Sequence, residues 1–326
     1  MPFTAESLTI DIAHEIEMIS RSIVDAVHHT LRRKGAVVAV SGGIDSAACA
    51  ALCVGALGNH RVLLLSLPEA ASSPESSVLA RDLAGTLGAE LTVDDITPVL
   101  DGARCYERQV EAIRQVFPEY GPGWKHKLTI PSILESDRLN ITRLTVQDPA
   151  GEQQTARLPA AAYLQLVAAT NFKQRARTTA TYYHADRLHY AVCGTPNRLE
   201  YDQGFFVKGG DGLADFKPIA HLYKSQVYAV AAALGVPEAI LQRTPTTDTF
   251  SLEQTQEEFY FALPYREMDL CLYAHNHRIP AAETAPVVGL TKEQVARVFD
   301  DIDAKRRSTA SLHRQGLLVE PIPEIG

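Results

Sequence analysis

A turn near the start of the chain combines the residue types that bind phosphate groups. Residues 41–46, SGGIDS, follow a short apolar run at 36–40 and precede an alanine-rich segment that continues to about Gly58. Two adjacent glycines allow a tight turn whose backbone N–H groups can approach phosphate oxygens closely. A helix beginning here would direct the positive end of its dipole toward the anion. The turn therefore predicts a nucleotide-phosphate site at Ser41, Gly42, Gly43, Asp45 and Ser46.

The carboxylate of Asp45 would repel a bare phosphate, so its expected role is to hold Mg²⁺ against the phosphates. The turn contains no lysine and therefore differs from the GxxxxGK[ST] loop, and it also lacks the GxGxxG pattern. A plain strand-to-helix connection is the alternative interpretation of a Ser-Gly-Gly turn.

The elements around this turn alternate between short strands and helices. Four short runs rich in apolar residues predict strands at 36–40, 61–68, 90–96 and 190–194. Helical periodicity occupies 6–32, the alanine-rich segment, 74–88, 161–190 and 223–235. Strands that alternate with helices form parallel sheets covered on both faces. We therefore predict an α/β fold with an open, mostly parallel sheet and helices on both faces, in a single domain spanning 1–326.

Residues 102–160 interrupt this alternation. The segments 140–147 and 152–158 alternate in polarity and flank Asp148-Pro149-Ala150-Gly151, a composition typical of a turn. We interpret 102–160 as an insertion that contains a β-hairpin and covers a site or a subunit contact. A disordered loop is the alternative.

Bulk properties narrow the class of protein. The net charge of −8 argues against a general nucleic-acid surface. No apolar run approaches the roughly 20 residues that cross a bilayer, and the N-terminus lacks the pattern of a signal peptide. Cytoplasmic location is the resulting expectation. The cysteine usage agrees with a reducing compartment: Cys49 and Cys53, four apart in the alanine-rich segment, fit small buried residues on one helix, and no chemistry is assigned to Cys105, Cys193 and Cys271.

Further motifs complete a resemblance to a known family. The turn resembles the SGGxDS loop of N-type ATP pyrophosphatases, which adenylate a substrate and release pyrophosphate. Ammonia-dependent NAD synthetases carry N-x-x-x-R-x-R, GTxNxxE and a glycine-rich G-[YF]-F-T-K-Y-G-D-G-x-x-D loop. Similar segments stand here, in the same order and spacing, at 171–177, 194–200 and 204–215, with further matches at 218–224 and 245–248. The resemblance covers roughly 10–100 and 165–306 and implies an adenine nucleotide alpha hydrolase-like fold.

The resemblance also implies an activity and site residues. A carboxylate, here deamido-NAD, would be adenylated by ATP, and ammonia would then displace AMP to give the amide. Lysines would neutralise the phosphates or the charge growing at the α-phosphorus. It assigns catalysis to Asp45, Lys208 and Lys224, and Mg²⁺ to Asp45 and Glu200. It adds Arg177, Thr195, Lys224 and Thr246 to the ATP site. It assigns the second substrate to Asn171, Arg175, Lys208, Asp211, Asp215 and Lys305.

Each of these residues also has an ordinary structural interpretation. The lysines could be solvated surface residues, and Arg175 could form a salt bridge on a helix surface. Asp211 and Asp215 could stabilise the turns of a glycine-rich loop. Position in the motif favours the functional interpretation.

Three departures from the family concern the second substrate. The stretch from Asp95 to Asn171 is tens of residues longer than usual. Only Lys305 matches a His-Lys pair near the C-terminus, and Glu69 stands where a basic residue is common after the second strand. An amide-forming ligase acting on a different carboxylate is therefore the alternative. A regulatory protein without catalysis and a tRNA-modifying enzyme rank lower, because Asp45, Glu200 and the lysines are present and the chain is acidic.

The nitrogen donor and the assembly follow from length and resemblance. Only some 35 residues precede the first strand, which leaves no room for a glutamine-hydrolysing domain. Free ammonia is therefore expected, unless a separate glutaminase subunit delivers it. The resemblance implies a homodimer, with helices 6–32 and 161–190 as candidate contacts.

Overall fold

A four-stranded parallel sheet lies at the centre of the molecule. The computed structural model describes residues 2–129, 142–245, 250–252, 254–255, 260–261 and 263–322. The strand order is β3-β2-β1-β7, and all three pairings are parallel. The strands are β1 (Ala36–Ala39), β2 (Val62–Ser66), β3 (Glu90–Val93) and β7 (Ala191–Cys193). The predicted fold class is therefore confirmed, with each predicted strand found within its expected range.

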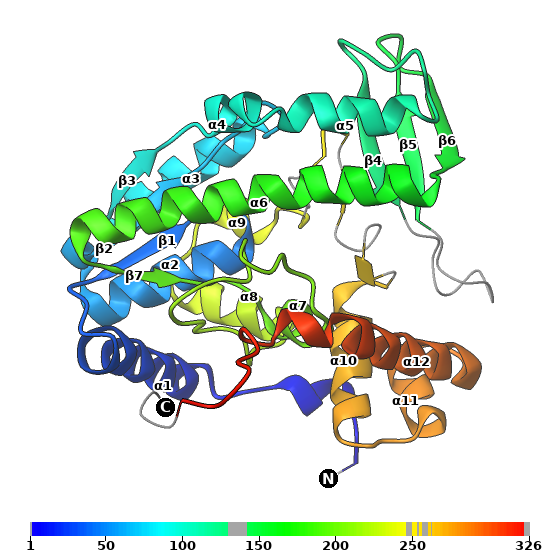
Figure 1. Ribbon diagram of the computed structural model, residues 1–326. Coiled ribbons are helices and arrows are strands. Elements are labelled where there is room, and N and C mark those ends of the chain that lie inside the picture. Colours follow the sequence, from blue (N-terminus) through cyan, green and yellow to red (C-terminus); the bar gives the residue numbers. More distant parts are fainter. Residues whose placement is uncertain are drawn as a thin grey trace.

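Alternate residues of the central strands enter two separate cores. Val38 and Leu64 face one side, which is covered by α1 (Ile12–Val24), α2 (Ile44–Leu57), α3 (Pro74–Leu87) and α8 (Lys224–Ala233). Val37 and Leu63 face the other, covered by α4 (Thr97–Gly102), α5 (Cys105–Arg114) and α6 (Ala160–Leu188). Figure 1 shows α6 running from the parallel sheet to a second sheet. Burial on both faces explains why the strands are apolar without alternation.

Helix boundaries follow local chemistry. The Oγ of Ser73 accepts a hydrogen bond from the backbone N–H of Glu75 at 3.3 Å, Pro74 opens α3, and Gly88 closes it in the left-handed region. The predicted helix 6–32 is instead three pieces: a 3₁₀ turn (Ala5–Leu8), α1, and a π-helical turn (Asp25–Thr30). Asp11 accepts from the backbone N–H of His14 at 3.1 Å, and this cap starts α1 anew.

The segment predicted as an insertion contains a three-stranded antiparallel sheet. Its strands are β4 (Lys125–Thr129), β5 (Arg143–Gln147) and β6 (Gln153–Arg157), so the predicted hairpin is confirmed for the described residues. Asp148 Oδ1 accepts from the backbone N–H groups of Ala150 and Glu152, both at 2.9 Å, which shapes the turn. The start of the predicted strand, Asn140 and Ile141, lies outside the described residues. The sheet packs on α5 and α6 through Ile113, Leu128, Leu144, Val146 and Leu166.

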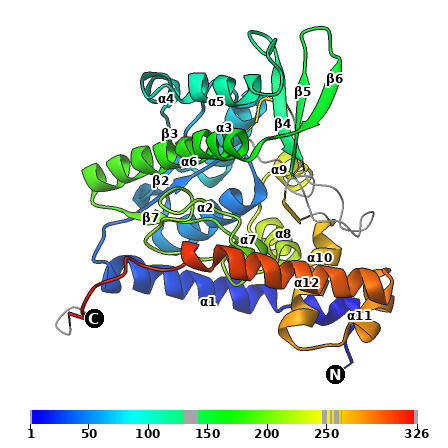
Figure 2. The same cartoon turned by 45° about the vertical axis from the view of Figure 1, so that its right-hand side comes forward.

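Residues 265–309 form a smaller helical group. It contains α10 (Tyr265–Asn276), α11 (Ala281–Val288) and α12 (Lys292–Thr309), and α7 (Arg198–Gln203) packs against α12. Short elements complete the described chain: α9 (Glu238–Leu241) and two 3₁₀ turns (Asn59–Arg61 and Ala310–Leu312). Figure 2 shows this group beside the parallel sheet. Within the described ranges, no helix is both long and apolar enough to cross a bilayer. All five cysteines are buried, which confirms the prediction for Cys49 and Cys53.

A buried ion pair links the loop after β2 to α6. Lys173 Nζ lies 2.9 Å from Glu69 Oε1, with side chains 1% and 0% exposed. Tyr106 Oη donates to Glu69 Oε2 at 2.8 Å, and the backbone N–H of Ala71 donates to the same oxygen at 3.1 Å. Glu69, an acidic departure from the family pattern, thus has a structural partner within the chain.

Replacing Glu69 with glutamine is expected to lower the free energy of unfolding by about 3 kcal/mol, because the Lys173 charge would stay buried without its carboxylate. Urea unfolding measures the change. In the matched control Glu17→Gln, an exposed pair with Arg21 is lost, and the cost should be below about 0.5 kcal/mol. Equal losses in the two variants would contradict the argument.

Burial of His126 on β4 makes stability depend on pH. The imidazole Nδ1 lies 2.8 Å from Tyr120 Oη, and burial lowers the pKa of His126 to about 3. The unfolded chain takes up a proton below pH 6.5 that the folded chain does not. The contribution of the neutral His126 side chain to the free energy of unfolding should therefore be fully present above pH 6.5. It should fall by up to about 1.4 kcal/mol per pH unit as the pH drops toward 3.

Thermal unfolding between pH 7.5 and 4.5 measures this slope. The variant His126→Gln should flatten it, whereas His14→Gln, at an exposed site on α1, should leave it unchanged. An unchanged slope in His126→Gln would show that other groups cause it.

Candidate active site

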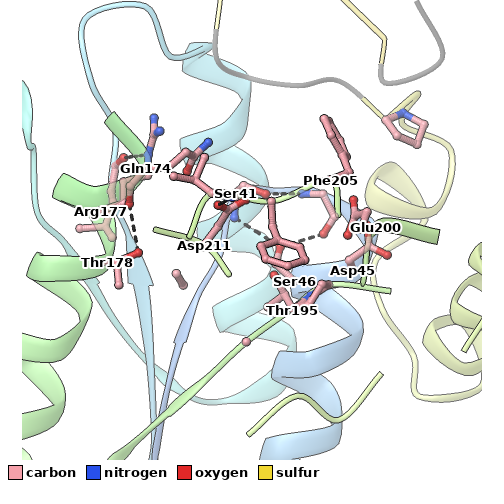
Figure 3. Close-up of a pocket in the computed structure, with 18 of the residues that line it drawn as sticks. Ser41, Asp45, Ser46, Gln174, Arg177, Thr178, Thr195, Glu200, Phe205 and Asp211 are labelled. Atoms are coloured by element: carbon pink, nitrogen blue, oxygen red, sulfur yellow. Dashed lines mark hydrogen bonds between the residues drawn. The ribbon is translucent and has the colours of Figure 1, made fainter. Parts of the chain in front are cut away.

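A cavity of about 600 Å³ opens at the carboxyl ends of β1, β2 and β7. This is the edge at which ligands bind in open parallel sheets. The phosphate turn, α6 and the loop after α7 contribute side chains to its wall (Figure 3). Eleven residues predicted from the sequence line it: Ser41, Gly43, Asp45, Ser46, Asn171, Arg177, Thr195, Glu200, Asp211, Lys224 and Lys305.

The turn between β1 and α2 is shaped by glycine and by serine hydroxyls. Gly42 adopts φ +75°, and a Cβ there would lie 3.0 Å from Arg243 Nη1 and 3.1 Å from Leu79 Cβ. Ser46 Oγ donates to the carbonyl oxygen of Gly43 at 2.9 Å and accepts from the backbone N–H of Ser41 at 3.3 Å. The backbone geometry thus requires glycine at 42 and fixes the hydroxyl of Ser46 inside the turn.

Asp45 and Glu200 approach each other from different helices. Asn197 connects them: its Nδ2 donates to Asp45 Oδ1 at 3.1 Å, and its backbone N–H donates to Glu200 Oε2 at 3.2 Å. Asn197 and Glu200 also form the capping box that begins α7. Lys224 Nζ, whose side chain is 1% exposed, forms an ion pair with Asp45 Oδ2.

The electrostatics of this cluster follow from burial and from two carboxylates. Burial and the charge of Asp45 raise the pKa of Glu200 to about 8. Burial lowers the pKa of Lys224, but the carboxylates of Asp45 and Glu200 raise it by more, so its net shift is upward. Lys224 is therefore charged, whereas a pKa of about 8 leaves Glu200 mostly protonated near pH 7. A further cation beside the two carboxyl groups would favour ionisation of Glu200.

The wall opposite the phosphate turn comes from α6. Arg177 Nε donates to the carbonyl oxygen of Leu67 at 3.2 Å, which holds the guanidinium at the cavity. Gln174 and Thr178 lie beside it in Figure 3. Lys305 Nζ, from α12, donates to the carbonyl oxygen of Tyr260 at 2.7 Å and lies 2.7 Å from Asp301 Oδ2.

Four predicted residues within the described ranges do not line this cavity: Gly42, which lies inside the phosphate turn, and Arg175, Lys208 and Asp215. Arg175 is exposed, and its Nε donates to the carbonyl oxygen of Lys208 at 3.2 Å. Lys208 Nζ donates to two carbonyl oxygens of the C-terminal segment, Ser311 at 3.1 Å and Arg314 at 2.7 Å. Asp215 accepts from the backbone N–H of Val192 at 2.8 Å and from Tyr182 Oη at 3.2 Å, which ties the glycine-rich loop to β7.

Two further predicted residues, Asp211 and Thr246, belong to loops. Asp211 faces the cavity and accepts from the backbone N–H of Val207 at 2.7 Å, so it shapes its loop as well. Thr246 lies outside the described residues. Arg243, three residues earlier, lines the cavity and was missed by sequence reasoning, although a basic residue near the quoted segment 245–248 was an available signal. Asn197 stood in the quoted motif without an assigned role.

The parallel sheet, the phosphate turn at its carboxyl edge and the acidic pair beside a buried lysine define a nucleotide-binding α/β protein. A sequence model described as NAD synthase matches residues 15–115 and 134–308, and the chain belongs to this family. The match leaves out 116–133, within the segment predicted as an insertion. The family predicted from the sequence is thereby confirmed.

Relatives named NH(3)-dependent NAD(+) synthetase match most of the chain. The Mesorhizobium japonicum protein is 58% identical over 97% of this chain and 99% of its own length. The Rhizobium meliloti protein is 54% identical over 99% and 96%, respectively. The Thermotoga maritima protein is 38% identical over 73% and 79%.

Solved structures share the fold at lower identity. The NH3-dependent NAD synthetase from Campylobacter jejuni, in complex with the nitrate ion, superposes with a TM-score of 0.62 at 22% identity. It covers 95% of this chain and 100% of that one. The NMN synthetase from Francisella tularensis gives a TM-score of 0.63 at 22% identity, covering 95% and 98%.

Proposed function

We propose that the protein is an ammonia-dependent NAD synthetase, which forms NAD from deamido-NAD, ATP and ammonia. The observation that carries this conclusion is the match to enzymes of that name over 97% and 99% of the chain. Those alignments include the insertion, so its presence does not favour another carboxylate substrate.

The chemistry needs two displacements. A carboxylate oxygen of deamido-NAD attacks the α-phosphorus of ATP, the bond to the β-phosphate oxygen breaks, and pyrophosphate leaves. Ammonia then attacks the carbonyl carbon of the mixed anhydride, AMP leaves, and a proton is lost from nitrogen. The chain's own part is positioning, charge stabilisation and exclusion of water from the adenylate.

Asp45 and Glu200 fit Mg²⁺. Mg²⁺ is usually held by one or two carboxylates together with substrate phosphates rather than by an all-protein cage. Two neighbouring carboxylates, one with a pKa raised to about 8, form such a donor set. The bound ion would supply positive charge against the phosphates.

The other residues divide between the two substrates. Ser41, Ser46 and the turn's backbone hold phosphate oxygens, while Lys224 faces the α-phosphorus. Thr195 and Arg177 complete the ATP site, and Thr246 stays a prediction. Asn171, Asp211 and Lys305 bind the second substrate. Arg175 and Lys208, which face away from the cavity, would reach that substrate only after a rearrangement, and Asp215 would support the loop.

The insertion covers the site within the single domain. Leu128 on β4 and Thr142 before β5 line the same cavity as the phosphate turn. Closure by this sheet would limit access of water to the adenylate. The homodimer, the optional glutaminase subunit and the cytoplasmic location stay predictions.

One assay tests the function. The protein is incubated with ATP, Mg²⁺ and ammonium, with and without deamido-NAD, and pyrophosphate and NAD are measured. Both products should appear only with deamido-NAD, and glutamine should not replace ammonium. Pyrophosphate release that ignores deamido-NAD would reject the substrate but keep the adenylation step.

A further inference from the structure

Arg243 stands against the phosphate turn from a distant part of the chain. It follows α9, 202 residues after Ser41, and its Nη1 donates to the carbonyl oxygen of Ser41 at 3.3 Å. Its Nη2 donates to Ser76 Oγ, in the first half of α3, at 3.1 Å. These bonds hold the guanidinium plane at the cavity wall, where it bridges the turn and α3.

The guanidinium keeps donors and charge for a ligand. It carries five N–H groups, and the two hydrogen bonds above use two of them. Its Nε lies 3.8 Å from Glu75 Oε2, too far for a hydrogen bond, and the Glu75 side chain is 66% exposed. The Arg243 side chain itself is 14% exposed, so its position is set by packing. An exposed, distant carboxylate neutralises it weakly.

The other cations of the cavity wall are engaged differently. Among the described residues, Lys224 pairs with Asp45 and Lys305 pairs with Asp301, while Arg177 is held by the carbonyl oxygen of Leu67. Arg243 is thus the cation that contacts the first residue of the turn, and the exposed Glu75 carboxylate, 3.8 Å from its Nε, compensates its charge only weakly. A planar fork with spare donors suits two phosphoryl oxygens better than an ammonium does.

We infer that Arg243 binds the terminal two phosphoryl groups of ATP and then the pyrophosphate that leaves. This inference rests on the proposed function only in taking ATP as the nucleotide. Contact with Ser41 places the guanidinium at the start of the turn, whereas Asp45, which pairs with Lys224, lies in the first turn of α2. Arg243 would therefore stabilise the leaving group, and Lys224 the reacting phosphorus.

Binding measurements on the full chain test the assignment. Dissociation constants for ATP, pyrophosphate and AMP are determined by calorimetry with Mg²⁺ and without deamido-NAD. In Arg243→Gln, the constants for ATP and pyrophosphate should rise about 10- to 100-fold, as expected for lost charge-assisted hydrogen bonds. The constant for AMP, which lacks the two terminal groups, should change less than about twofold.

Two further variants keep the test decisive. Arg243→Lys retains the positive charge but not the planar guanidinium, so its dissociation constants for ATP and pyrophosphate should lie between those of the wild type and Arg243→Gln. If Arg243→Gln fails to unfold cooperatively, Arg243→Lys serves as the test variant. Arg21→Gln, at an exposed position on α1, is the matched control and should bind all three ligands normally. Equal weakening of AMP, or unchanged ATP binding in a folded variant, would overturn the inference. Because deamido-NAD is absent, these results are independent of the choice of carboxylate.

Discussion

Asp45→Asn is expected to lower the rate of pyrophosphate release at least about 100-fold while the protein stays folded. Asparagine has the shape of aspartate but no charge, so it would bind Mg²⁺ more weakly and cannot form an ion pair with Lys224. Asn197, which now donates to Asp45 Oδ1, can still donate to the amide oxygen. The measurement is pyrophosphate release at saturating ATP, deamido-NAD and ammonium, with thermal unfolding in parallel.

The matched control is Asp95→Asn. Asp95 accepts from the backbone N–H of Thr97 at 2.8 Å at the start of α4, and asparagine can keep that bond. Activity should therefore stay within about twofold of wild type. Retention of more than half the activity in a folded Asp45→Asn protein would refute the metal and charge roles of this carboxylate.

The core of the fold was predictable because its signals come from residues close together in the sequence. The strands at 36–40 and 61–68 are apolar without alternation because both faces of β1 and β2 are covered. The turn at 41–46 carries its own signal, since the strained position at Gly42 and the serine bonds depend on adjacent residues. The hairpin around Asp148 was predictable for the same reason.

Features that depend on distant contacts were not predictable. Arg243 reaches Ser41 across 202 residues, and Glu69 pairs with Lys173 across 104. Motif position identified Lys208 but could not give the direction of its side chain, which the C-terminal carbonyl groups determine. The packing of α5 against the three-stranded sheet likewise needs α6, whose apolar residues lie about 50 positions away on the chain.

Lys224→Met is expected to lower pyrophosphate release about 100-fold or more and the free energy of unfolding by about 3 kcal/mol. Methionine can fill much of the buried volume, but it leaves Asp45 beside Glu200 without the cation between them. Activity and urea unfolding are measured on the same preparation. Lys292→Met, at an exposed position near the start of α12, is the matched control and should change neither quantity appreciably.

Loss of stability alone could lower activity, and the double variant Asp45→Asn/Lys224→Met separates the two causes. Removing both charges leaves neither one buried and unpaired, so the double variant should be more stable than Lys224→Met alone. The rate of pyrophosphate release in the double variant should nevertheless stay as low as in the less active single variant. The nucleotide would still lack both the Asp45 carboxylate and the Lys224 ammonium group. Recovery of activity together with stability would show that the pair only holds α2 and α8 together. Stability that recovers without activity would place the buried lysine and its carboxylate in the reaction itself.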